Sequence, residues 1–262
     1  MRRSKMLAKW RSGRFARVCS AGHFLPFFIR YAAHNGYDGI WLDLEHRTMD
    51  DREVQAFIAH CYYNDIDCMV RPQTREASHL YHYLEDGAAG FMFPLVSTAE
   101  VARQLVEAVK FPPLGNRGID GAGLDGDYGL EAWRPDATYF EDANRETFVV
   151  VQIETLEAVQ NVEEIAAVPG VDCLFIGPGD LGYRLRVAGS SVGLTLTEIV
   201  ERVAAAARKN GKAWGIAAGS LEDLAWYRRM GAQVVPRGGD FSLTEVLRRC
   251  KEELDSVLQD EE

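Results

Sequence analysis

Short apolar runs rich in β-branched and aromatic residues alternate along this chain with longer segments of helical periodicity. The first pattern is typical of buried strands, and an apolar residue at every third or fourth position is typical of a helix packed on one face. The pattern predicts strands at Phe15–Ser20, Gly39–Leu44, Ile66–Arg71, Gly90–Val96, Phe148–Glu154, Cys173–Ile176, Ala213–Ala217 and Gln233–Pro236. It predicts helices at Leu25–Asn35, Asp51–Asn64, Glu76–Asp86, Ala99–Lys110, Leu156–Ala167, Thr197–Lys209, Leu221–Met230 and Leu243–Leu258.

Strict alternation of strand and helix indicates parallel strands joined by crossover helices. Eight such repeats predict the α/β class and, within it, a (β/α)₈ TIM barrel that forms a single domain over residues 1–262. Glycines follow four predicted helices, at positions 36, 87, 211 and 231. Because glycine readily adopts the left-handed conformation that ends a helix, these positions support the element count.

Two connections are longer than the others. The first, residues 111–147, begins with Pro112-Pro113 and has glycines at 115, 118, 121, 123, 126 and 129. We expect this segment to be a bent loop that shapes the entrance of a site, with a plain surface insertion as the alternative. The second, Leu181–Thr195, would flank the same opening.

The composition of the chain limits the kinds of molecule that it is expected to bind. The 262 residues carry a formal net charge of -10, which argues against nucleic acid or an anionic membrane as a partner. An anionic substrate would be repelled unless the site holds a metal ion or an arginine. The five cysteines are odd in number and lack C-x-x-C spacing, so we expect reduced thiols in a cytoplasmic protein. No apolar stretch has the length of a membrane span.

Two carboxylates mark the ends of neighbouring predicted strands. The run from Val149 ends on Glu154, and the next strand leads through Gly177-Pro178-Gly179 to Asp180. Parallel neighbours lie about 4.8 Å apart, which is close enough for both acids to bind one divalent cation. As an alternative, each acid alone would be explained as a cap of the helix that follows it.

Further polar residues fall at the carboxyl ends of other strands, where the active site of a barrel forms. Asp43 and His46 follow the second strand, Arg71 ends the third, and Gln152 lies near the end of the fifth. A lone histidine is more often structural, and Arg71 alone would be explained as a salt bridge at the barrel mouth. Their convergence from several strands favours a catalytic site, because helix capping does not explain it.

Several motifs resemble one family. They are the segments Gly36–His46, Val70–Pro72, Gly115–Gly118, Val151–Thr155 and Gly177–Leu181. They resemble the HpcH/HpaI aldolase family of metal-dependent class II pyruvate aldolases, which includes enzymes for 4-hydroxy-2-oxoheptanedioate and 2-dehydro-3-deoxyglucarate. The similarity covers roughly Phe15 to Leu247.

The resemblance implies a role for each matching residue. Glu154 and Asp180 match the metal ligands, for Mg²⁺ or Mn²⁺ with Co²⁺ as a further candidate. Arg71 matches the residue that stabilises the enolate, His46 the acid/base, and Asp43 an acidic neighbour in the site. The remaining matches are Glu85 as the carboxylate that supports the histidine, and Gln152, Pro178, Gly179 and Arg117 as substrate-binding residues.

The resemblance also implies an assembly and a reaction. The family fold is a phosphoenolpyruvate/pyruvate-type modified barrel whose last helix is exchanged between subunits of a homo-oligomer, a hexamer or a trimer. The implied reaction reversibly cleaves a 4-hydroxy-2-oxo acid to pyruvate and an aldehyde. Two carboxylates suit a hard cation, which with Arg71 would stabilise an enolate. No lysine stands among these strand-end residues, which disfavours a Schiff base.

Departures from the family pattern cluster on the aldehyde side. Arg47-Thr48 replaces a small residue and proline, Glu85 replaces an aspartate, and Ala217-Ala218 replaces bulkier aliphatics. These changes keep two alternatives open. One is a related metal-enolate lyase or synthase, for example an oxaloacetate decarboxylase, and the other is a barrel without catalysis that serves as a binding subunit.

Overall fold

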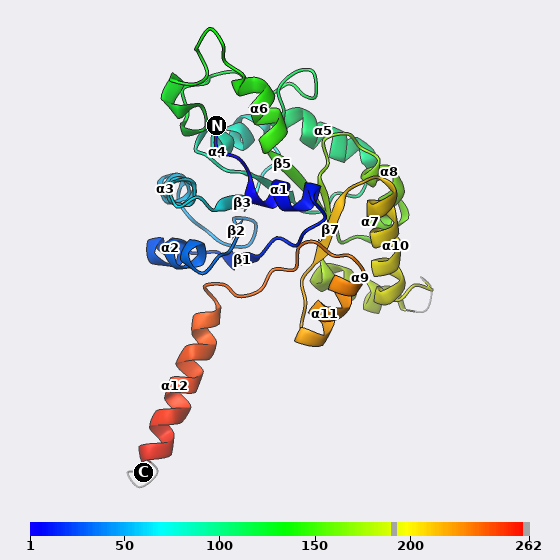
Figure 1. Ribbon diagram of the computed structural model, residues 1–262. Coiled ribbons are helices and arrows are strands. Elements are labelled where there is room, and N and C mark those ends of the chain that lie inside the picture. The colour runs from blue at the N-terminus through cyan, green and yellow to red at the C-terminus, as the bar shows by residue number, and fades with distance from the viewer. Residues whose placement is uncertain (190–192, 259–262) are drawn as a thin grey trace.

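Seven parallel strands form one sheet in the order in which they occur in the sequence (Figure 1). They are β1 (Val18–Ala21), β2 (Gly39–Asp43), β3 (Asp67–Arg71), β4 (Gly90–Phe93), β5 (Phe148–Ile153), β6 (Cys173–Ile176) and β7 (Ala213–Ile216). The helices are α1 (Lys5–Arg11), α2 (Pro26–His34), α3 (Asp51–Tyr63), α4 (Ala77–Glu85), α5 (Ala99–Val109), η1 (Leu124–Gly129), α6 (Tyr139–Glu146), α7 (Leu156–Gln160), α8 (Val162–Ala166), α9 (Pro178–Ala188), α10 (Leu196–Lys209), α11 (Leu221–Arg229) and α12 (Ser242–Leu258). This computed structural model describes residues 1–189 and 193–258.

The segment predicted as an eighth strand, 233–236, is not a strand. Its Val234 instead makes single parallel bridges to Ala16 and to Gly215 of β7, and Gly239 makes a third to Ser20 of β1. The segment therefore joins the two ends of the curled sheet without a regular ladder. Pro236 gives the physical reason, because it has no amide hydrogen to donate to a neighbouring strand.

Local capping fixes several helix starts and ends. The Thr155 side chain accepts the Ala158 N–H at the start of α7, as its position after β5 predicts. Capping boxes begin α3 at Asp50 and α10 at Thr195. The glycines at 36, 87, 211 and 231 all have positive φ, which confirms the predicted helix ends. The single helix predicted over 156–167 is divided into α7 and α8 at Asn161.

The two faces of the sheet bury different sets of side chains. Alternate residues of β5, such as Val149 and Val151, pack in the large cluster between the sheet and the helices. The intervening residues Phe148 and Val150 pack in a second cluster inside the curled sheet. Because side chains alternate along a strand, Gln152 and Glu154 continue this inner row toward the carboxyl end of β5.

The amino-terminal ends of the strands are covered by α1, which the sequence pattern did not predict. Met6, Leu7 and Trp10 of α1 belong to the inner cluster. Ser4 accepts the Leu7 N–H as the N-cap of α1, and its hydroxyl donates to Asp67 at the start of β3. The inner core is thus closed at this end and open to polar residues at the other.

The glycine-rich connection, residues 111–147, lies at this same amino-terminal end, so the prediction that it shapes the site entrance is wrong. It contains η1 and α6, and its Glu131 pairs with the amino group of Met1. Lys110 donates to the carbonyls of Asn144 and Thr147, just before β5. A segment that leads from a helix into a parallel strand must reach the amino-terminal end of that strand.

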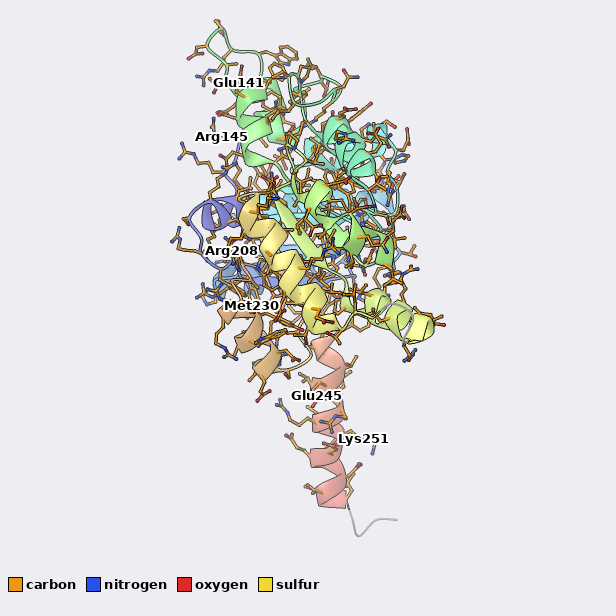
Figure 2. All side chains as sticks on the ribbon, turned by 90° about the vertical axis from the view of Figure 1, so that its right-hand side faces the viewer. Glu141, Arg145, Arg208, Met230, Glu245 and Lys251 are labelled. Carbon is orange, nitrogen blue, oxygen red and sulfur yellow. The ribbon has the colours of Figure 1, made fainter. Side chains whose placement is uncertain are left out.

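The connection predicted at Leu181–Thr195 begins as a helix, because α9 runs from Pro178 to Ala188; its residues 190–192 lie outside the described ranges. The last helix, α12, projects from the body of the protein (Figure 1). None of its residues is buried. Figure 2 shows the far half of α12, with Lys251, extending beyond the other elements.

Candidate active site

Arg71 is the centre of an ion-pair cluster at the carboxyl ends of β2 and β3. Asp43 and Arg71 are aligned across the two strands. Nε of Arg71 donates to Oδ1 of Asp43 at 3.0 Å, and its NH2 lies 2.8 Å from Oδ2. NH1 lies 3.1 Å from Oε2 of Glu45, and the guanidinium stacks 4.7 Å from the centre of the Trp41 ring. Arg71 is thereby held in one orientation, with its side chain 11% exposed.

Asp43 also organises the loop that carries the histidine. Its Oδ1 accepts the backbone N–H groups of Glu45 and His46, at 3.1 and 3.3 Å. Burial raises the pKa of Asp43, but the hydrogen bond and charge of Arg71 outweigh burial, so its pKa lies below the ordinary value. His46 is 56% exposed at the mouth, with Nε2 3.6 Å from Oε2 of Glu45. Glu45 thus links the histidine to the arginine.

Glu154 lies just past β5 and is 4% exposed. Its Oε1 accepts the Leu95 backbone N–H at 2.7 Å, and its Oε2 accepts the Gln152 side-chain amide at 3.1 Å. Burial raises the pKa of Glu154, and the charges of Asp180 and Glu45 raise it further, against the opposing hydrogen bond from Leu95. A cation beside this carboxylate would stabilise its charged form and so oppose the raised pKa.

The backbone around Glu154 is adapted to this position. Leu95 has φ of 55°, a conformation that bulky residues rarely adopt, and so directs its N–H at the carboxylate. Gly177, which follows β6, lies so near that a Cβ there would be 2.2 Å from Oε2 of Glu154. Only glycine therefore fits at position 177 beside an undisplaced Glu154.

Asp180 stands in the first turn of α9, next to Pro178 and Gly179. Because β5 pairs with β6, Glu154 and Asp180 follow neighbouring strands, and their charges interact. The Asp180 side chain is 56% exposed, with Arg184 at 3.8 Å. A Cβ on Gly179 would meet nothing within 4 Å, so the space beside this turn is open. Within residues 1–189 and 193–258 no group of three or more His, Cys, Asp or Glu side chains forms a ready metal site.

Glu85 and Arg117 do not join this group. Glu85 ends α4, beside Gly123, and Arg117 forms a buried pair with Asp125 at 2.9 Å. Both lie toward the amino-terminal ends of the strands, where α4 terminates and the 111–147 segment packs. The pairing of Glu85 with His46 expected from the resemblance is therefore not made within the chain, and the Arg117 side chain, 1% exposed, is engaged elsewhere.

Two further residues contribute to the site without a prediction from the sequence. Glu45 follows a predicted strand, as His46 does, so its position carried the same signal. The Leu95 amide has no side-chain signature, since its function depends on a backbone conformation. Only the register of β4 against β5 brings it to Glu154.

Comparison with known proteins places this geometry in a family. Residues 21–245 match the model of the HpcH/HpaI aldolase/citrate lyase family. The chain belongs to this family. It is 33% identical over 231 residues to a hydroxypyruvate/pyruvate aldolase of Paraburkholderia phytofirmans, covering 86% of each chain. It is 33% identical over 208 residues to a 5-keto-4-deoxy-D-glucarate aldolase of Klebsiella pneumoniae, covering 79% of each.

The fold is similar to that of a solved member of the HpcH/HpaI family. The Burkholderia cenocepacia family member superimposes with a TM-score of 0.83 at 31% identity, covering 97% of this chain and 99% of the other. The family and the aldolase relatives make this protein a carbon–carbon lyase. The described residues include no helix with the length and apolarity needed to cross a membrane.

Proposed function

We propose that this HpcH/HpaI family member is a divalent-metal-dependent aldolase that reversibly cleaves a 4-hydroxy-2-oxo acid to pyruvate and an aldehyde. The observation that carries the proposal is the placement of the Glu154 carboxylate and the Arg71 guanidinium at the same end of the curled sheet, close enough for their charges to interact. The names of the aldolase relatives support a pyruvate-type product.

The residues around Glu154 fit a hard divalent cation. Glu154 and Asp180 would hold it, and both offer oxygen ligands of the kind that Mg²⁺ and Mn²⁺ prefer. Oε1 of Gln152 is buried without a hydrogen-bond partner among the described residues. This oxygen could therefore face a bound cation as a further electron-pair donor. When bound, the cation would supply positive charge that stabilises negative charge on the keto and carboxylate oxygens of pyruvate.

Arg71 is suited to bind a developing enolate oxygen. An arginine has five N–H donors, and three contacts to Asp43 and Glu45 are made by Nε, NH2 and NH1. The remaining N–H groups can donate to a substrate oxygen while the pairs stay intact. Because the ion pairs and Trp41 already fix the guanidinium, little reorganisation is needed as negative charge develops.

We assign the proton transfer to His46. In the cleavage direction the C3–C4 bond breaks, its electron pair enters the enolate, and the proton of the C4 hydroxyl passes to a base as the aldehyde forms. His46 lies at the exposed mouth, with Oε2 of Glu45 3.6 Å from its Nε2, and would act as this base. Protonation of the enolate carbon then releases pyruvate.

The assembly is part of the proposal. Helix α12 has 17 residues and none buried, and its apolar side chains Leu243, Val246, Leu247, Leu254, Val257 and Leu258 are all exposed. An apolar stripe of this length needs a partner. We infer that α12 packs on another subunit, as in an exchanged last helix. Four buried free cysteines support a reducing, cytoplasmic location.

A metal-depletion assay tests the proposed function. Protein treated with EDTA is expected to lose pyruvate release from a 4-hydroxy-2-oxo acid, and added Mg²⁺ or Mn²⁺ to restore it. Glu154→Gln is expected to lower the restored activity by about 100-fold or more. Full activity in EDTA would contradict the proposal. Oxaloacetate decarboxylation, measured in parallel, would favour the alternative reaction if it were much faster than aldol cleavage.

A further inference from the structure

A small hollow opens beside Arg71 at the carboxyl ends of β1 and β2. It shares Asp43, Trp41 and Arg71 with the site, and its other lining residues are Ser20, Ala21, Gly22, Arg47, Asp240 and Phe241. Its volume is about 150 Å³, against roughly 30 Å³ for a water molecule in the liquid. The hollow therefore holds a short polar fragment of a few heavy atoms, next to the place where the chemistry is proposed.

Arg47 is a positive group of this hollow that pairs with no acid in the described part of the chain. The lining contains two cations, Arg71 and Arg47. Arg71 is paired with Asp43 and Glu45, whereas Arg47 has no ion pair within 4 Å among the described residues. One of its N–H groups donates to the His46 carbonyl at 2.7 Å, which leaves most of its five donors free.

The Arg47 side chain is held against the hollow from two sides. A Cβ on Gly22 would lie 2.5 Å from Cγ of Arg47, so the glycine leaves the space that the arginine stem occupies. On the other side, the guanidinium lies 4.8 Å from the centre of the Phe241 ring. These contacts position a charged group without consuming its hydrogen-bonding capacity.

The acidic residues of the lining are already engaged. Asp43 binds Arg71, and Asp240 accepts the Gly22 N–H and contacts Nδ1 of His23, both at 2.8 Å. Asp43 and Glu45 together exceed the single charge of Arg71, and the whole chain carries a net charge of -10. A second anionic group on a substrate would be repelled here unless a free cation receives it. Arg47 is placed to do so.

We propose that Arg47 is a specificity-determining residue that binds an acidic group at the far end of the aldehyde partner. The substrate class is then a 4-hydroxy-2-oxo acid with a second anionic terminus, such as a dicarboxylic acid, and its short chain spans the hollow from Arg71 to Arg47. This assignment rests on the proposed aldolase function and adds the chemistry of its second substrate.

The test compares a charged aldehyde with its neutral counterpart in the synthesis direction. Pyruvate, Mg²⁺ and either 4-oxobutanoate or its methyl ester are supplied to the wild type and to Arg47→Ala, Arg47→Gln and Arg47→Lys. The wild type is expected to prefer the acid. In Arg47→Ala and Arg47→Gln the KM for the acid is expected to rise by about tenfold or more, while the KM for the ester stays within about twofold. Arg47→Lys is expected to recover part of the loss.

Arg30→Ala is the matched control, because it removes one positive charge from the exposed surface of α2. This variant is expected to leave the KM for the acid and the KM for the ester unchanged. An equal effect of the Arg47 variants on acid and ester, or no effect on either, would overturn the role of Arg47 while leaving the aldolase function intact. A wild type that condenses neither aldehyde with pyruvate would overturn the proposed function, and the role of Arg47 with it. Arg47→Gln keeps the test usable if the alanine variant does not fold.

Discussion

Oε2 of Glu154 occupies the space that a side chain at Gly177 would need, since a Cβ there would lie 2.2 Å away. The two residues follow β5 and β6, so the requirement for glycine on one strand end arises from the carboxylate on the other.

Gly177→Ala is therefore expected to displace Glu154. The apparent affinity of this variant for the activating metal is expected to fall by about tenfold or more, as for other changes that misorient a ligand. The measurement is activity against Mg²⁺ or Mn²⁺ concentration. Gly182→Ala in α9 is the control, because a Cβ there meets nothing within 4 Å. Metal activation that is the same in both variants would contradict the expected displacement of Glu154.

Arg71→Lys is expected to lower kcat/KM for aldol cleavage by about 100-fold to 1000-fold. A lysine is a point charge and cannot contact Asp43 and Glu45 with parallel donors while also binding substrate. Metal affinity, measured by calorimetry, is expected to change little. Arg202→Lys serves as the control, because Arg202 also contacts a carboxylate through two nitrogens, that of Glu163 at 2.9 and 3.0 Å, but on the surface.

Asp43→Asn is expected to make stability less dependent on acid pH. The pKa of Asp43 lies below its ordinary value of 3.8, so the charged form contributes stability that is present above about pH 4 and lost as the pH falls through the folded-state value. Denaturant unfolding is expected to show the wild type about 1–3 kcal/mol more stable than the variant at pH 7, with the difference shrinking toward pH 3.

The exposed Glu222→Gln variant of α11 provides the comparison for this pH series, with no difference expected at either pH. A stability difference between wild type and Asp43→Asn that stays constant from pH 7 to pH 3 would contradict the stabilising role of the charged Asp43.

Leu247→Glu combined with Leu254→Glu is expected to reduce the mass of the protein in solution. These leucines are 70% and 63% exposed on one face of α12, so the change costs a lone subunit little but disrupts a helix packed on a neighbour. Light scattering measures the mass. Arg249→Gln, on the opposite face of the helix, is expected to leave it unchanged. A monomeric wild type would refute the inferred exchange of α12.

Much of the site followed from strand periodicity. Glu154 and Arg71 were predicted because buried strands are readable as apolar runs and because side chains at the carboxyl ends of parallel strands converge. Thr155 was predicted as a cap from its place before an amphipathic segment, and it does accept the Ala158 N–H.

Other features needed the folded chain. The glycine-rich segment lies at the amino-terminal end of the sheet because it runs from α5 into β5, and glycine content alone does not indicate at which end a segment lies. The seventeen residues of α12 have the periodicity of a packed helix, yet the described residues of the chain cover none of its apolar face. Periodicity states that a face is apolar and does not state what covers it.

The sequence by itself determined the alternation of strands and helices, the helix caps and the set of acids, arginine and histidine that end the strands. These depend on neighbours within a few residues, so they are encoded locally. Only the tertiary structure decided that Glu45 pairs with Arg71, that the Leu95 amide holds Glu154, and that Arg47 lies against Phe241. Such contacts join segments far apart in the chain, and the curvature and register of the sheet set their distances.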